Sequence, residues 1–140
     1  MTSATTDPKA STRQRAIEAA NAPAPVGPYS QAIAHGGWVF VSGQIPLDPA
    51  SGEKVPGEIE IQTERVLDNL SAVLQEGGSS LDRVVRTTIY LTDLSLFPRV
   101  NAVYARYFAS DPSPARATVG VSALPLGCAV EIDAIATVAD

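Results

Sequence analysis

The chain has 140 residues, which is enough for one domain with a hydrophobic core and too short for two. Its formal net charge of −5 argues against a nucleic-acid binder, because phosphate contacts need clustered lysine and arginine. No apolar run approaches the ~20 residues of a transmembrane helix, so no membrane association is expected. With one cysteine, Cys128, and one histidine, His35, the chain has no internal disulfide and no His/Cys zinc ligand set. The single thiol suits a reducing, cytoplasmic location.

The N-terminal part of the chain leads into a proline-rich segment. Residues 1–14 are rich in serine, threonine and alanine, which predicts a flexible lead without a secretory signal. Three prolines and a glycine within 21–31 then predict a rigid, extended path that ends at Tyr29. Such a path suits either the wall of a binding site or a turn that packs the phenol on the core.

Residues 32–43 predict a β-hairpin whose turn is formed by two consecutive glycines. His35 lies beside that turn, so we expect it to be exposed and to take no part in catalysis. Ser42 and Gly43 end the second strand, where a small hydroxyl and a backbone N–H can approach a ligand closely. The alternative is that Gly43 only permits a bend.

Two helices and a strand follow. Residues 58–76 place apolar side chains at helical spacing, and two glycines then end this helix. The β-branched run 84–91 predicts a central strand. Asp93 and Ser95 can cap a second helix with an aromatic stripe, which we assign to the core. Asn101 lies beside that stripe and is either a polar contact or a surface residue.

The last two predicted strands each carry a charge in apolar company, and we expect them to be paired or neighbouring. In the first strand, Arg116 and Thr118 share a face; in the second, Glu131 lies opposite an apolar face. A guanidinium fork suits a small carboxylate ligand, and Glu131 is a possible general base. The alternative, which the charges alone favour, is a structural ion pair between Arg116 and Glu131.

The predicted order is β-β-α-β-α-β-β, which lacks a strict alternation of strands and helices. This order indicates an α+β sandwich, in which two helices cover one face of a mixed sheet. The single domain would span residues 15–140. The uncovered face would carry apolar residues such as Ile135, so we expect a second copy of the chain to cover it.

An ordered set of short segments resembles the RidA (YjgF) family of reactive enamine/imine deaminases. The segments keep the family's order and approximate spacing from about Arg15 to the C-terminus, and the set is specific although each member is weak. They are Asn21-Ala22-Pro23, Gly27-Pro28-Tyr29-Ser30-Gln31, Val41-Ser42-Gly43-Gln44-Ile45, Val100-Asn101-Ala102-Val103-Tyr104, Pro114-Ala115-Arg116, Ala123-Leu124-Pro125 and Val130-Glu131-Ile132-Asp133-Ala134-Ile135-Ala136.

The resemblance implies a chorismate-mutase-like fold and a homotrimer with ligand pockets between its subunits. It implies hydrolysis of 2-enamines and 2-imines, such as 2-aminoacrylate and 2-iminopropionate, to 2-keto acids and ammonia without a cofactor. Arg116 matches the arginine that binds the substrate carboxylate, and Glu131 matches the acid that activates the water. Further pocket positions are implied at Tyr29, Ser42, Gly43, Asn101 and Thr118. At the last of these, several bacterial members carry a cysteine.

Two other functions are compatible with the sequence. The first is a non-catalytic trimer that binds small keto or amino acids, or a protein partner, in a regulatory or chaperone role. The second is RNA cleavage, an activity reported for some relatives. The acidic composition and the lack of a basic, aromatic surface disfavour RNA cleavage.

Overall fold

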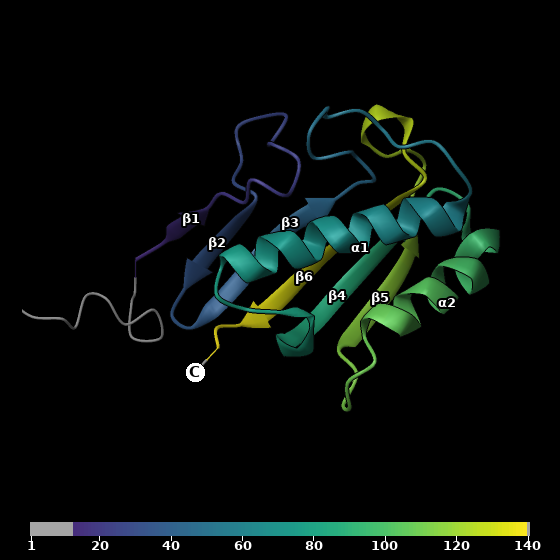
Figure 1. Cartoon of the computed structure of the whole chain (residues 1–140). Coiled ribbons are helices and arrows are strands. Elements are labelled where there is room, and N and C mark those ends of the chain that lie inside the picture. The colour runs from purple at the N-terminus through teal and green to yellow at the C-terminus, as the bar shows by residue number, and fades with distance from the viewer. Residues whose placement is uncertain (1–12, 140) are drawn as a thin grey trace, which may run out of the picture.

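The computed structural model describes residues 13–139, which form one six-stranded sheet with two helices packed on one of its faces (Figure 1). The elements are β1 (Arg15–Ile17), β2 (Ala32–His35), β3 (Trp38–Gln44), α1 (Ile59–Glu76), β4 (Val84–Leu91), α2 (Phe97–Tyr107), β5 (Ala115–Gly120) and β6 (Val130–Thr137). The strand order is β1-β2-β3-β6-β4-β5, and only β4 and β5 run parallel. The predicted α+β sandwich with a mixed sheet is therefore confirmed.

The N-terminal edge of the sheet differs from the predicted order by one strand. β1 has three residues and pairs with β2 from Arg15 opposite Ala34 to Ile17 opposite Ala32. Three residues are too few for an alternating pattern to be distinguished in a sequence. Most of the flexible lead predicted for residues 1–14 lies outside the described residues.

The predicted hairpin is confirmed, and its second strand contains an irregularity. β2 and β3 pair across Gly36 and Gly37, whose φ angles of 59° and 87° are the left-handed values that a tight type I′ turn requires. His35 is exposed, as expected. The register of β3 against β6 shifts between Val41 and Gln44, which places a bulge at the two residues predicted to approach a ligand.

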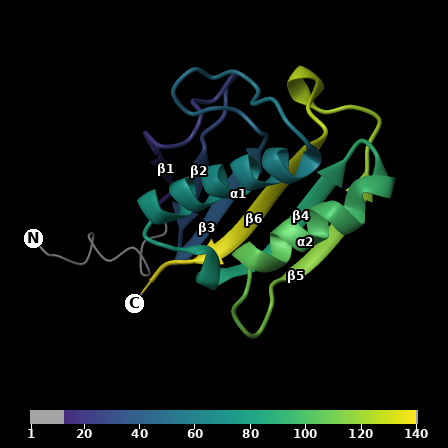
Figure 2. The ribbon, with the colours of Figure 1, turned by 45° about the vertical axis from the view of Figure 1, so that its right-hand side comes forward.

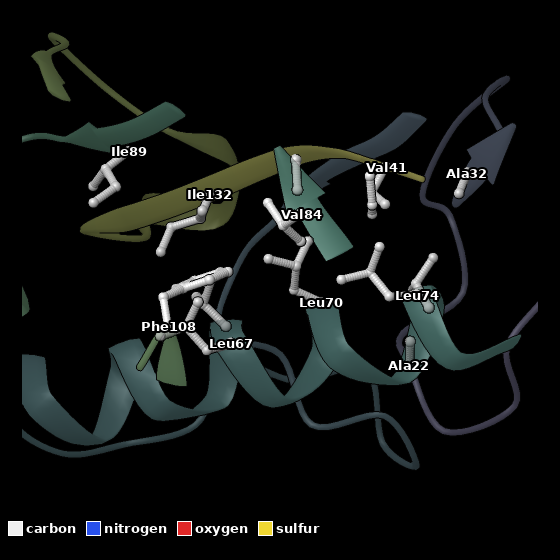
Figure 3. Close-up of a cluster of buried hydrophobic side chains, with 14 of the residues drawn as sticks. Ala22, Ala32, Val41, Leu67, Leu70, Leu74, Val84, Ile89, Phe108 and Ile132 are labelled. Carbon is white, nitrogen blue, oxygen red and sulfur yellow. The ribbon is translucent and has the colours of Figure 1, made fainter. Parts of the chain in front are cut away.

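The core lies between the sheet and α1. The apolar side of α1 is buried as its periodicity predicts, and no helix in residues 13–139 is long and apolar enough to cross a membrane. Figure 3 shows Leu67, Leu70 and Leu74 of α1 pointing toward the strands that carry Ile132 and Val41. The three leucines are fully buried. Their burial anchors α1 on the central strands.

Ion pairs at the surface join the two helices. Arg99 of α2 contacts Glu60 of α1 at 2.7 Å, and Arg106 contacts Glu64 at 2.7 Å. The hydrogen bonds from Arg99 lower the pKa of Glu60 to about 2. Exposed ion pairs of this kind contribute little to stability. Figure 2 shows α2 lying across β4 and β5.

The expectation that the last two predicted strands are paired or neighbouring is wrong, because β4 lies between β5 and β6. The α2 crossover brings the chain back parallel to β4 on its outer edge. Arg116 is in register with Thr87, which is fully buried toward the helices. Glu131 is in register with Tyr90, which comes three residues after Thr87 on β4. Because side chains alternate along a strand, Tyr90 and Glu131 project from the face opposite to Thr87. Arg116 thus faces α2, and Glu131 faces away from both helices.

The face of the sheet away from the helices is apolar and open in the single chain. Trp38 and Phe40 alternate with buried Val39 and are 43% and 45% exposed. Phe40 lies opposite Ile135 in the pairing of β3 with β6. Clusters of large exposed apolar side chains are typical of protein–protein interfaces, and the second copy expected to cover this face stays a prediction.

Replacing Leu70 by alanine tests the core. Leu70→Ala should lower the free energy of unfolding by about 2–5 kcal/mol, because a fully buried side chain would leave a cavity. Ile61→Ala on the same helix is the matched control, since Ile61 is 49% exposed. It should cost less than about 1 kcal/mol. Urea unfolding at one protein concentration measures the free energy of unfolding of both variants. Equal losses would contradict the placement of Leu70 in the core.

Candidate active site

Glu131 presents an unpaired carboxylate on the open face of the sheet. Its side chain is half-buried, and within residues 13–139 no group donates a hydrogen bond to it. Burial and the nearby charge of Asp133 raise the pKa of Glu131 above its usual value. A carboxylate that is partly desolvated and free of donors is a good proton acceptor, because no hydrogen bond stabilises its charge.

Gly43 allows the Glu131 side chain to lie directly against β3. A Cβ atom placed on Gly43 would overlap Oε2 of Glu131 and lie 2.7 Å from its Cδ. The glycine therefore does more than permit a bend in the strand. Its missing side chain leaves the space that the carboxylate occupies, and the bulge in β3 brings its backbone there.

Ser42 and Tyr29 adjoin this glycine. The Ser42 hydroxyl donates to the carbonyl of Ser30 at 2.6 Å, which fastens the proline-rich segment to β3. Tyr29 is 49% exposed, so the alternative that it packs on the core is wrong. Tyr29 and Gly43 line the same small depression. We call Glu131, Gly43, Ser42 and Tyr29 the glutamate group.

The buried amide of Gln31 fixes the path of the proline-rich segment. Its Oε1 accepts from the backbone N–H of Ala19 at 2.5 Å, and its Nε2 donates to the carbonyls of Ala19 and Pro23 at 3.2 and 2.8 Å. A second depression of about 530 Å³ lies along this segment and is also lined by Tyr29. Neither Arg116 nor Glu131 lines it, so its volume alone does not mark the reactive position.

Arg116 is held from α2. Its Nη1 donates to Oδ1 of Asn101 at 2.8 Å, so Asn101 is a polar contact rather than a plain surface residue. The guanidinium carbon lies 5.2 Å from the ring centroid of Phe97 and 4.8 Å from that of Tyr104, within the range of cation–π attraction. Tyr104 is itself fixed by a 2.7 Å hydrogen bond to buried Thr87.

The remaining donors of Arg116 are available to a ligand. A guanidinium carries five N–H donors, and Asn101 is the only hydrogen-bond acceptor for them within residues 13–139. Thr118 follows two residues later on the same face of β5 and is half-buried. We call Arg116, Asn101 and Thr118 the arginine group.

The two groups do not meet in one chain. They lie on opposite faces of the sheet, and β5 and β6 are separated by β4, which places the strands about 10 Å apart. The alternative of a structural ion pair is wrong, since Arg116 and Glu131 form none in the described part of the chain. A small ligand bound by Arg116 within the same chain would not reach the Glu131 carboxylate.

The structure adds residues that the sequence did not identify. Phe97 and Tyr104 belong to a stripe assigned entirely to the core, yet both also hold Arg116. Tyr90 donates a hydrogen bond to Asp133, two residues after Glu131. No local pattern marks these contacts, because they depend on how α2 packs over β5 and on the register of β4 against β6.

Comparison with known proteins gives one consistent result. The family described as endoribonuclease L-PSP matches residues 19–138. Protein DfrA of Myxococcus xanthus is 58% identical over 125 residues, which cover 88% of this chain and 95% of that protein. The chloroplastic Reactive Intermediate Deaminase A of Arabidopsis thaliana is 46% identical over 127 residues, covering 91% of this chain and 67% of that protein.

The solved structures agree in fold. The crystal structure of YyfA from Yersinia pestis, a protein of the conserved Rid family, superposes with a TM-score of 0.87 at 48% identity. The match covers 90% of this chain and 100% of the YyfA chain. With the family match over most of its length, the chain belongs to the RidA/YjgF family, which is also described as the endoribonuclease L-PSP family.

Proposed function

We propose that this protein hydrolyses small 2-imino acids, and their 2-enamine tautomers, to 2-keto acids and ammonia. The observation that carries the proposal is the unpaired, half-buried carboxylate of Glu131, whose pKa is raised. The deaminase activity in the name of the Arabidopsis relative supports this reaction class. The free, buried thiol of Cys128 is compatible with a reducing cytoplasmic location.

The active site is completed by two copies of the chain. One copy supplies the arginine group and the next supplies the glutamate group, since the sheet separates them within one chain. The exposed apolar side chains of Trp38 and Phe40 favour this association, because a second copy would remove them from water. Closure of the contact around a threefold axis would give a homotrimer with three equivalent sites.

In this arrangement, Arg116 binds the carboxylate of the substrate through two parallel hydrogen bonds. Asn101 and the rings of Phe97 and Tyr104 keep the guanidinium in one orientation. A carboxylate held in this way places the adjacent C=N carbon at a fixed position. Orientation of this kind lowers the barrier by removing the entropy cost of bringing the reactants together.

Glu131 then accepts a proton from a water molecule while the water oxygen forms a bond to the C=N carbon. The imine nitrogen takes up a proton, which Glu131 can deliver, and the product is a tetrahedral carbinolamine. When the C–N bond breaks, the nitrogen leaves with its electron pair and is protonated by the hydroxyl proton through Glu131. One imine and one water thus give one keto acid and one ammonia.

The reaction requires Glu131 in its ionised form at the start. Activity should therefore fall as the pH drops through the raised pKa of this carboxyl.

No cofactor is needed, because the C=N carbon is already electrophilic. Gly43 supports the step by leaving the carboxylate room against β3.

Two competing functions predict different outcomes. A regulatory binder of keto or amino acids would bind such ligands at Arg116 without accelerating ammonia release. An endoribonuclease, the activity in the family description, would cleave RNA. The composition of 10 Lys and Arg against 15 Asp and Glu disfavours a surface for phosphate contacts.

A coupled assay tests the proposed reaction. A serine dehydratase generates 2-aminoacrylate, and pyruvate formation is followed against the spontaneous rate. We expect the wild-type protein to accelerate pyruvate formation. Glu131→Gln should lower the catalysed rate by about 100-fold or more. Arg116→Lys should lose most of the activity, although it keeps the charge. Arg99→Lys, in a partly exposed ion pair between α2 and α1, is the matched control and should retain full activity. Wild-type rates in Arg116→Lys would contradict the carboxylate-binding role.

Replacing Gly43 by alanine tests the position of the Glu131 side chain. The added methyl group would occupy the place of the carboxylate and push a flexible side chain aside. Gly43→Ala should thus lower kcat by about 10-fold or more with little loss of stability. Gly52→Ala is the control for added volume, because a Cβ there meets nothing within 4 Å. Its φ of 74° makes alanine costly to stability, but kcat should be unchanged. Unchanged kcat in Gly43→Ala would mean that this contact is irrelevant to catalysis.

A further inference from the structure

A second carboxylate lies beside Glu131 in a contrasting environment. Oδ1 of Asp133 accepts a hydrogen bond from the backbone N–H of Thr88 at 3.1 Å, and its Oδ2 accepts one from the hydroxyl of Tyr90 at 2.9 Å. Each oxygen of Asp133 is therefore engaged with β4. The Glu131 carboxylate, by contrast, accepts no hydrogen bond within residues 13–139.

The two carboxylates share one face of one strand. Residues two apart in a strand project from the same side, so Asp133 is the neighbour of Glu131 along β6. Tyr90 lies directly opposite Glu131 in the pairing of β4 with β6, but its hydroxyl is turned to Asp133. The phenol therefore does not stabilise the Glu131 charge by a hydrogen bond.

Within residues 13–139 of one chain, few titratable groups face the Glu131 carboxyl. On its own strand the facing group is Asp133, and on β4 it is Tyr90. The thiol of Cys128, in the loop that precedes β6, also interacts with it. On β3 the adjoining residue is Gly43, which carries no charge. Asp133 is the strongest charge in this set, and it is negative. In the proposed two-chain site, the arginine group of the neighbouring copy adds one positive charge.

We propose that Asp133 is a positioning residue, held by Tyr90 and the backbone of β4, that fixes a negative charge beside Glu131 and thereby strengthens Glu131 as the acceptor of the water's proton. A carboxylate whose oxygens are both engaged is poorly available as a base itself. Glu131, whose carboxylate accepts no hydrogen bond within residues 13–139, is available as a base. Two acidic residues on one strand thus take separate roles because their hydrogen bonds differ.

This inference deepens the proposed deaminase function and rests on it. A purely structural role is the competing explanation, since the Tyr90–Asp133 hydrogen bond also joins β4 to β6. The two explanations differ in one measurable respect. A structural contact changes stability, whereas a fixed charge changes the protonation of Glu131.

The test is the titration of the Glu131 carboxyl in the full chain and in Asp133→Asn. Asparagine retains an oxygen that can accept from Thr88, so the strand contact can survive while the charge is lost. Carboxyl ¹³C NMR of glutamate-labelled protein follows the titration, and Glu131→Gln identifies the signal. We expect the midpoint in Asp133→Asn to move to lower pH by about 0.5 or more. The acid limb of the kcat/KM profile should move in the same direction.

A second tyrosine–aspartate pair provides the control. Tyr107 of α2 donates to Asp68 of α1 at 3.0 Å, on the helical side of the molecule. Asp68→Asn should leave the Glu131 titration unchanged. If Asp133→Asn does not fold, Tyr90→Phe, which keeps the charge and the contact with the Thr88 backbone but releases Oδ2, should lower the midpoint by a smaller amount.

An unchanged Glu131 midpoint in a folded variant would overturn the inference, whatever the enzyme does. Absence of catalysed deamination in the wild-type protein would overturn the proposed function instead. The NMR titration needs no substrate, so the two failures are distinguishable.

Discussion

The register of β4 against its two neighbours is the constraint on which the candidate site depends. β4 pairs with β5 on one side and β6 on the other, and it places Thr87 beside Arg116 but Tyr90 beside Glu131. Because three residues separate these positions, the guanidinium and the carboxylate emerge on opposite faces. The charges are therefore kept apart within a chain, and in the proposed site they meet a ligand between two chains.

The two charges of the proposed site lie in different environments. The Arg116 guanidinium is immobilised by an amide and two aromatic rings, which suits a group that must hold a ligand in one orientation. The Glu131 carboxylate is left without donors, partly desolvated and next to Asp133, which suits a group that must take up a proton. Both arrangements fit the proposed reaction, in which one group holds a small anionic substrate and the other takes up a proton.

Local patterns were enough to predict much of the fold. The glycine pair at residues 36–37 predicts the hairpin, the spacing of apolar residues in 58–76 predicts α1, and the β-branched run predicts β4. The separation of Arg116 from Glu131 was not predictable, because strand order and register are set by contacts distant in the sequence. For the same reason, no pattern distinguishes Tyr104 as a support for Arg116 from a residue that only fills the core. Residue patterns supplied most of the candidate residues, the resemblance of ordered segments supplied Thr118 and the implied roles, and the structure supplied the division into two groups.

The most direct test of the account is complementation between two inactive variants. Arg116→Ala and Glu131→Ala chains, each with its own affinity tag, are co-expressed, and assemblies that carry both tags are isolated. If the site is shared between neighbouring copies, a mixed trimer regains one intact site and about one third of the wild-type deaminase activity, while each variant alone is inactive. If the wild-type protein is active but the mixed assemblies are not, a site built from two chains is contradicted.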